Sequence, residues 1–127
     1  MARWTIMGWY WPSSSGDKIY CPVDHHKTRT FTGFVEVSED GIFKGITTDS
    51  FGSADIVGSI YGSKLEFSKK YRESAVGRGG AKGEISYLLQ TAKIKIKNKE
   101  IDTGWRGVYG GKNAHGNAAC MLYPLPL

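Results

Sequence analysis

The chain contains few cysteines, few prolines and no long apolar run. Its 127 residues include two cysteines and four prolines. Cys21 and Cys120 form no Cys-x-x-Cys motif, so they are either free thiols, which we favour, or partners in one disulfide bridge. No apolar stretch approaches the about 20 residues that a transmembrane helix needs. The N-terminus also lacks the charged and apolar regions of a signal peptide. We therefore expect a cytoplasmic protein that does not associate with a membrane.

The sequence is also poor in groups that bind metal ions. It has three histidines, and the only cluster with a metal-like composition is Cys21, Asp24, His25 and His26, with His115 far away in the sequence. A structural zinc site needs four protein ligands and a catalytic one about three. Exposed histidines in a polar loop are the simpler interpretation. We predict no metal site and no cofactor.

Motifs that carry catalysis are missing as well. The chain has no Gly-x-Ser-x-Gly nucleophile motif, and Cys120 lies in an apolar segment, 118–121, where a buried and inert thiol is expected. The glycine-rich run 77–83 lacks the order of residues found in a phosphate-binding loop. No catalytic residue is assigned, and an enzyme is less favoured than a binding protein.

Glycine and alternating apolar residues are abundant. The chain has 17 glycines, 40% hydrophobic residues and 13% aromatic residues, which is typical of a single globular domain spanning residues 1–127. Alternation of apolar and polar residues, interrupted by glycine, predicts short strands joined by turns. The predicted strands cover 3–11, 29–37, 42–49, 54–61, 64–70, 84–97, 101–109 and 117–123.

Three connections in this pattern need comment. The stretch 12–28 reads as a long loop, with a further short strand near 19–23, and 72–83 reads as a flexible connection. Segment 84–97 fits helical spacing in part, but its β-prone residues favour a strand. Its inward positions change from odd to even numbers, which requires a bulge near 90–92. The result is an all-β fold, an eight-stranded antiparallel up-and-down β-barrel.

The order of aromatic residues and turns resembles that of a known group of barrels. It begins with Trp4-x-Ile6-x-Gly8-x-Tyr10 and continues with Asp40-Gly41-x-Phe43-x-Gly45-x-x-x-Asp49-x-x-Gly52, Ile56-x-Gly58, Leu65-x-Phe67-x-Lys69-x-Tyr71 and Gly104-Trp105. This series is similar to the calycin-type barrels, the avidin-like and lipocalin-like group. The resemblance implies a meander barrel with a ligand site at one mouth. It carries over no individual ligand-binding residue.

Strand parity sorts side chains into inward and outward sets. Successive residues of a strand point to opposite faces. Leu65 and Phe67 therefore place Lys69 and Tyr71 on the inner face, and Phe43 places Thr47 and Asp49 there. Asp49 and Lys69, near a barrel mouth, would pair or would bind a polar ligand. The alternatives are that both lie at the rim in water, or that Asp49 caps the following turn. The aromatic residues on the inner face would line a pocket or form a filled core. The candidate ligand-binding residues are Trp4, Tyr10, Phe43, Thr47, Asp49, Phe67, Lys69, Tyr71, Tyr87 and Trp105.

Three functions are consistent with this pattern. The first is a non-enzymatic small-molecule-binding barrel with its ligand site at the mouth. The second is a nucleic-acid or anionic-partner module that uses the basic strand 93–99, where lysines alternate. The net charge of +5 suits such a partner. A solvated strand face is nevertheless the better account of these lysines. The third is a small barrel enzyme using Asp49 and Lys69. Trp9 and Trp11, on the outer face, would form a homo-oligomer contact or a lid.

Overall fold

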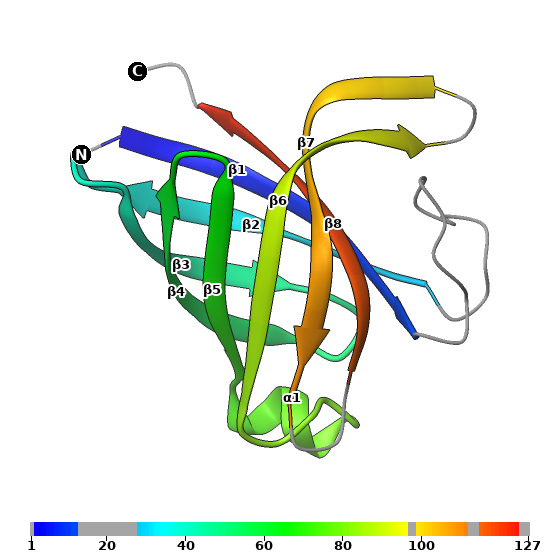
Figure 1. Ribbon diagram of the computed structural model, residues 1–127. Coiled ribbons are helices and arrows are strands. Elements are labelled where there is room, and N and C mark those ends of the chain that lie inside the picture. The colour runs from blue at the N-terminus through cyan, green and yellow to red at the C-terminus, as the bar shows by residue number, and fades with distance from the viewer. Residues whose placement is uncertain (1, 13–27, 97–98, 112–114, 125–127) are drawn as a thin grey trace.

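The computed structural model describes residues 2–12, 28–96, 99–111 and 115–124, with only the backbone described at 12, 94–96 and 99–103. These residues form eight strands: β1 (Ala2–Pro12), β2 (Arg29–Val37), β3 (Ile42–Thr48), β4 (Ser53–Tyr61), β5 (Lys64–Tyr71), β6 (Glu84–Ile96), β7 (Lys99–Gly110) and β8 (His115–Pro124). Each strand pairs with the next in antiparallel fashion, and β8 pairs with β1. The predicted all-β, eight-stranded up-and-down barrel is confirmed (Figure 1).

Strand alternation places side chains as the sequence predicts. In β5, Leu65, Phe67, Lys69 and Tyr71 are buried, whereas the residues between them are more exposed. The described part of segment 84–97 is a strand rather than a helix: β6 runs to Ile96, and its register against β7 shifts between Ala92 and Ile94, next to the predicted bulge. Such a shift places one extra residue in one strand of the pair and changes which residues of that strand share a face.

The connection at 72–83 corrects one expectation. It was predicted as a flexible segment, but it contains a short helix, α1 (Glu73–Gly77). Ala75 of α1 is completely buried, so packing against the barrel stabilises a helix too short to persist alone. α1 lies across one end of the barrel (Figure 1). The short strand predicted near 19–23 lies outside the described residues.

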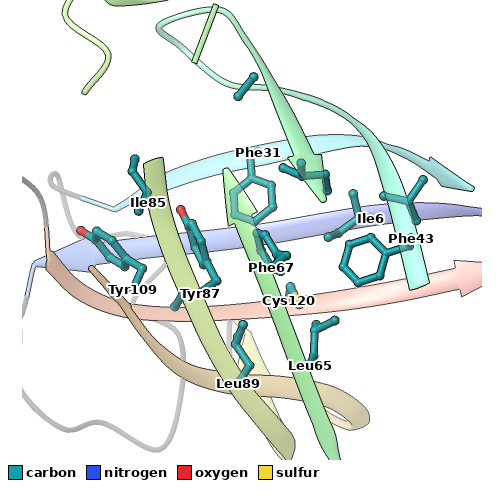
Figure 2. Packing of buried hydrophobic residues seen from close by; sticks show 14 of the residues in the cluster. Ile6, Phe31, Phe43, Leu65, Phe67, Ile85, Tyr87, Leu89, Tyr109 and Cys120 are labelled. Atoms are coloured by element: carbon teal, nitrogen blue, oxygen red, sulfur yellow. The ribbon is translucent and has the colours of Figure 1, made fainter. Parts of the chain in front are cut away.

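Aromatic side chains occupy the barrel interior (Figure 2). The ring centroids of Phe43 and Phe67 lie 6.2 Å apart, and Phe67 stacks on Tyr87 at 4.4 Å. Tyr87 stacks in turn against Tyr109 at 5.5 Å. A Cβ atom at Gly8 would lie 2.2 Å from the ring of Phe31, so glycine there is what lets this ring pack across β1. The column of rings runs along the interior toward the α1 end.

The outward tryptophans of β1 are buried. Trp9 and Trp11 form a second apolar cluster with Ala119 and Met121, separate from the barrel interior. Their outward direction agrees with strand parity, because Ile6 and Gly8 occupy the inner face of the same strand. Their predicted role in an oligomer contact or a lid stays a prediction.

Candidate functional site

A cavity of about 400 Å³ opens at the α1 end of the barrel. Four tyrosines from four different strands, Tyr10, Tyr71, Tyr87 and Tyr109, contribute to its wall together with Lys69 and the segment 79–82. The two charged side chains in the described lining are Lys69 and Lys82. An apolar, aromatic wall with a few convergent polar groups is the usual composition of a small-molecule site.

Asp49 reaches this end of the barrel from the turn between β3 and β4. The backbone N–H of Asp49 donates to the carbonyl of Gly52 at 3.0 Å, and the N–H of Gly52 donates back at 3.2 Å. The Oδ1 atom of Asp49 accepts a hydrogen bond from the backbone N–H of Phe51 at 2.9 Å. This side-chain-to-backbone bond is an Asx turn, which fixes the carboxylate relative to the strands.

The second carboxylate oxygen of Asp49 gathers the polar groups of the site. Asp49 Oδ2 accepts hydrogen bonds from the hydroxyl of Tyr10, at 2.8 Å, and from that of Tyr71. It lies 3.6 Å from Lys69 Nζ, and the side chains of Asp49 and Lys69 are each only 1% exposed. The two expectations for Asp49 are therefore combined: one oxygen caps the turn and the other forms an ion pair, inside the barrel rather than in water at the rim.

The ammonium group of Lys69 is enclosed by aromatic rings. Its Nζ lies 4.5 Å from the ring centroid of Tyr10, 4.7 Å from that of Tyr71, 4.8 Å from that of Phe31 and 5.6 Å from that of Tyr87. It donates a hydrogen bond to the Tyr87 hydroxyl at 3.3 Å. Ring faces attract a cation, most strongly when water is excluded. Lys69 is held by Asp49, one hydroxyl and this aromatic cage.

Burial changes the proton affinity of these groups. Burial lowers the pKa of Lys69 to about 8, although the charge of Asp49 and its hydrogen bond act in the opposite direction. Burial opposes ionisation of Asp49, but the hydrogen bond from Tyr71 and the charge of Lys69 outweigh it and lower the pKa of this carboxyl. Burial raises the pKa of Tyr10 and Tyr71. At neutral pH the site holds a carboxylate, a mostly charged lysine and neutral phenols.

The turn that carries Asp49 is supported from two sides. The guanidinium carbon of Arg29 lies 4.3 Å from the ring centroid of Phe51, and Arg29 donates to the Ser50 hydroxyl at 2.8 Å. On the other side, the rings of Phe51 and Tyr71 meet edge to face at 6.0 Å. The turn is therefore packed against β5 as well as being continuous with β3 and β4, so the carboxylate has a defined position.

The predicted site residues divide into two groups. Tyr10, Asp49, Lys69, Tyr71 and Tyr87 are brought together at the α1 end of the barrel. The others lie elsewhere: Phe43, Thr47 and Phe67 are buried along the interior, and Trp4 and Trp105 are partly buried against the same core.

Three aromatic residues of the site are not among those that reasoning from sequence predicts. Phe31 and Tyr109 occupy inward positions, which the parity of 29–37 and 101–109 could have shown. Phe51 belongs to a segment that reads only as a turn. Its ring lies beside Tyr71 because of the turn's packing, for which the sequence carries no signal.

Other candidate sites are less informative. Cys120 is a free, buried thiol, and burial raises its pKa, which disfavours the reactive thiolate. The described residues contain no group of three or more potential metal ligands, and none of their helices is long and apolar enough to cross a membrane. The cluster around Cys21 and His25, and most side chains of the lysine-rich strand 93–99, lie outside what the structure describes.

An open hollow of about 1020 Å³ lies on the outer surface of β1–β4. It is larger than the mouth cavity and includes the exposed side chains of Phe34, Ile46 and Val57. It lacks the buried charges that distinguish the mouth. Comparison of the chain with protein-family models, with curated proteins and with solved structures gave no match, so the site is interpreted from its own geometry.

Proposed function

We propose that this protein is a calycin-like, non-enzymatic barrel that binds a small molecule in the cavity at the α1 end. The observation that carries the proposal is the buried pair of Asp49 and Lys69 beside a cavity of about 400 Å³. Burying two charges is costly, and apolar side chains in their place often give an equally stable protein. A charge kept in this position, next to open space, suits recognition better than stability.

The wall of the cavity indicates the chemistry of the ligand. Its tyrosine rings favour a flat, unsaturated body that can stack against them. Its charged lining groups are Lys69 and Lys82; Asp49 pairs with Lys69, so the site keeps a net positive charge that favours a ligand oxygen. The best match is an aromatic or conjugated molecule that carries a carboxylate or a carbonyl oxygen, with that oxygen directed at Lys69.

A calorimetric titration with trans-cinnamate tests this proposal. We expect saturable binding at one site per chain. Lys69→Met keeps the volume of the side chain and removes its charge. The loss of one charge-assisted hydrogen bond should weaken binding about tenfold.

Lys70→Met is the matched control, because Lys70 is the next residue of β5 and points outward. Its affinity for cinnamate should equal that of the unmodified chain. Absence of saturable binding, or equal losses in the two lysine variants, would contradict a ligand site at this mouth. Circular dichroism of each variant shows that the comparison is made between folded proteins.

A further inference from the structure

The groups around Lys69 Nζ would stabilise a positive charge on this nitrogen whether or not the nitrogen carries a covalently bound ligand. Three features are built around Nζ: a carboxylate at 3.6 Å, a hydroxyl at 3.3 Å and four aromatic rings within 5.6 Å. The same side chain lines the cavity. A lysine that served only as a structural ion pair would need neither an aromatic enclosure nor contact with open space.

We infer that Lys69 captures the carbonyl group of an aldehyde ligand as a reversible Schiff base within the mouth cavity. This inference rests on the proposed function, because the aldehyde must first bind in the cavity. It adds a covalent step that binding alone does not imply. The chemical class of ligand is a conjugated or aromatic aldehyde.

The step is balanced without any further reactant. The Lys69 ammonium first gives a proton to a neighbouring base, and the neutral amine attacks the carbonyl carbon. The new C–N bond becomes C=N, the C=O bond breaks, and the oxygen leaves as water with two hydrogens that came from the ammonium group. One hydrogen remains on nitrogen, so an ammonium is replaced by an iminium and the charge of the site does not change.

Asp49 is placed to assist at both stages. Its Oδ2 is the carboxylate atom nearest to Lys69 and accepts hydrogen bonds from Tyr10 and Tyr71, so it can act as counter-ion first to the ammonium and then to the iminium. Aromatic faces stabilise an iminium as they do an ammonium. The lowered pKa of Lys69 supplies more neutral amine at pH 7 to 8 than an exposed lysine would have.

Burial of Lys69 restricts which aldehydes can react with it. Only 1% of its side chain is exposed, whereas Lys70 next to it is exposed. An aldehyde that does not enter the cavity reacts with Lys70 and other surface lysines. An aldehyde that does enter is held next to Nζ, and this proximity raises the local concentration of the carbonyl group.

Trapping with trans-cinnamaldehyde and sodium borohydride tests the inference on the 127-residue chain. Borohydride reduces the imine to a stable secondary amine, which mass spectrometry of the intact protein and of its peptides then locates. We expect one adduct per chain, at Lys69, with about tenfold more modification there than at Lys70. Lys69→Met should lose this adduct and Lys70→Met should keep it. Excess cinnamate should compete with its formation.

The outcomes separate the two proposals. Modification restricted to exposed lysines, or none, in a protein that still binds cinnamate overturns the Schiff base and leaves the ligand site intact. Failure of both cinnamate binding and modification of Lys69 overturns both. Asp49→Asn gives a further readout. Its adduct yield should fall, because the iminium loses its counter-ion, and the pH at which half the adduct forms should move to a lower value, because the charge of Asp49 raises the pKa of Lys69. If the Asp49→Asn variant is folded and its pH profile is unchanged, the role given to Asp49 is contradicted.

Discussion

The two ends of the barrel interior are built on the same strand alternation but from different chemistry. Away from α1, the inward positions hold apolar residues such as Phe43, Val35 and Leu65, each at most 1% exposed. At the α1 end, the same inner face of β5 carries Lys69 and Tyr71, which meet Asp49. One end stabilises the fold by excluding water. The other retains charge at a cost in stability, which is the usual mark of a functional region.

The largest loss of stability is expected from a substitution that leaves a cavity at the apolar end. Phe43→Ala should lower the free energy of unfolding by about 4 kcal/mol, because it removes a buried ring and leaves a cavity. Urea denaturation followed by tryptophan fluorescence measures this change. If the loss were below about 1 kcal/mol, Phe43 would not be part of a closely packed interior.

A smaller loss is expected at the charged end. Asp49→Asn leaves the Lys69 ammonium buried without its counter-ion and should cost about 3 kcal/mol at pH 7. The double variant Asp49→Asn, Lys69→Met removes both charges and should recover most of that loss. A double-mutant cycle by urea denaturation measures the coupling. Simple additivity of the two substitutions would show that these side chains do not interact.

The charged end should also make stability depend on pH. The pKa of Lys69 falls from its ordinary 10.5 to about 8 on folding, so between about pH 8 and 10 the unfolded chain binds more protons and stability rises with pH. Above that range the raised pKa values of Tyr10 and Tyr71 reverse the slope, because the unfolded chain loses its phenol protons first. In acid, stability falls as Asp49, whose pKa is lowered, becomes protonated.

Comparison with Lys69→Met isolates the lysine part of this profile. The variant should lack the rise between about pH 8 and 10 and keep the loss in acid. Thermal unfolding at half-unit pH intervals gives both curves. Parallel curves in the alkaline range would mean that Lys69 titrates as an ordinary exposed lysine.

The smallest effect is expected outside both regions. Ile46→Ser changes an exposed side chain, 44% accessible, on the outer face of β3, and should alter the free energy of unfolding by no more than about 0.5 kcal/mol. Affinity for cinnamate should also be unchanged. A clear loss of cinnamate binding in this variant would show that the ligand binds on the outer surface instead of at the mouth.

The sequence predicts the barrel because its signals are local. Alternation fixes which side chains of a strand face inward, and turn residues such as Gly41, with φ at +85°, mark where strands reverse. Parity also predicts that Asp49 and Lys69 lie on the inner face. A distance of 3.6 Å between atoms of residues twenty positions apart depends on barrel closure and strand register, which no local pattern specifies.

The other differences between prediction and structure also come from tertiary packing. α1 was missed because Glu73–Gly77 is stabilised by the burial of Ala75 rather than by a sequence pattern. Phe43 and Phe67 were grouped with the ligand-binding residues because parity separates inside from outside but does not separate a filled interior from an open mouth. That distinction depends on how the rings stack along the barrel.

The proposed ligand site lies at the charged, α1 end of the barrel. The most direct test is a map of backbone ¹H–¹⁵N chemical shifts during titration with trans-cinnamate. We predict saturable changes concentrated at residues 49–52, 69–71, 79–82 and Tyr109, which line the cavity or lie close in sequence to residues that do. Changes concentrated around Phe34, Ile46 and Val57, or no saturable change at the mouth, would contradict the account.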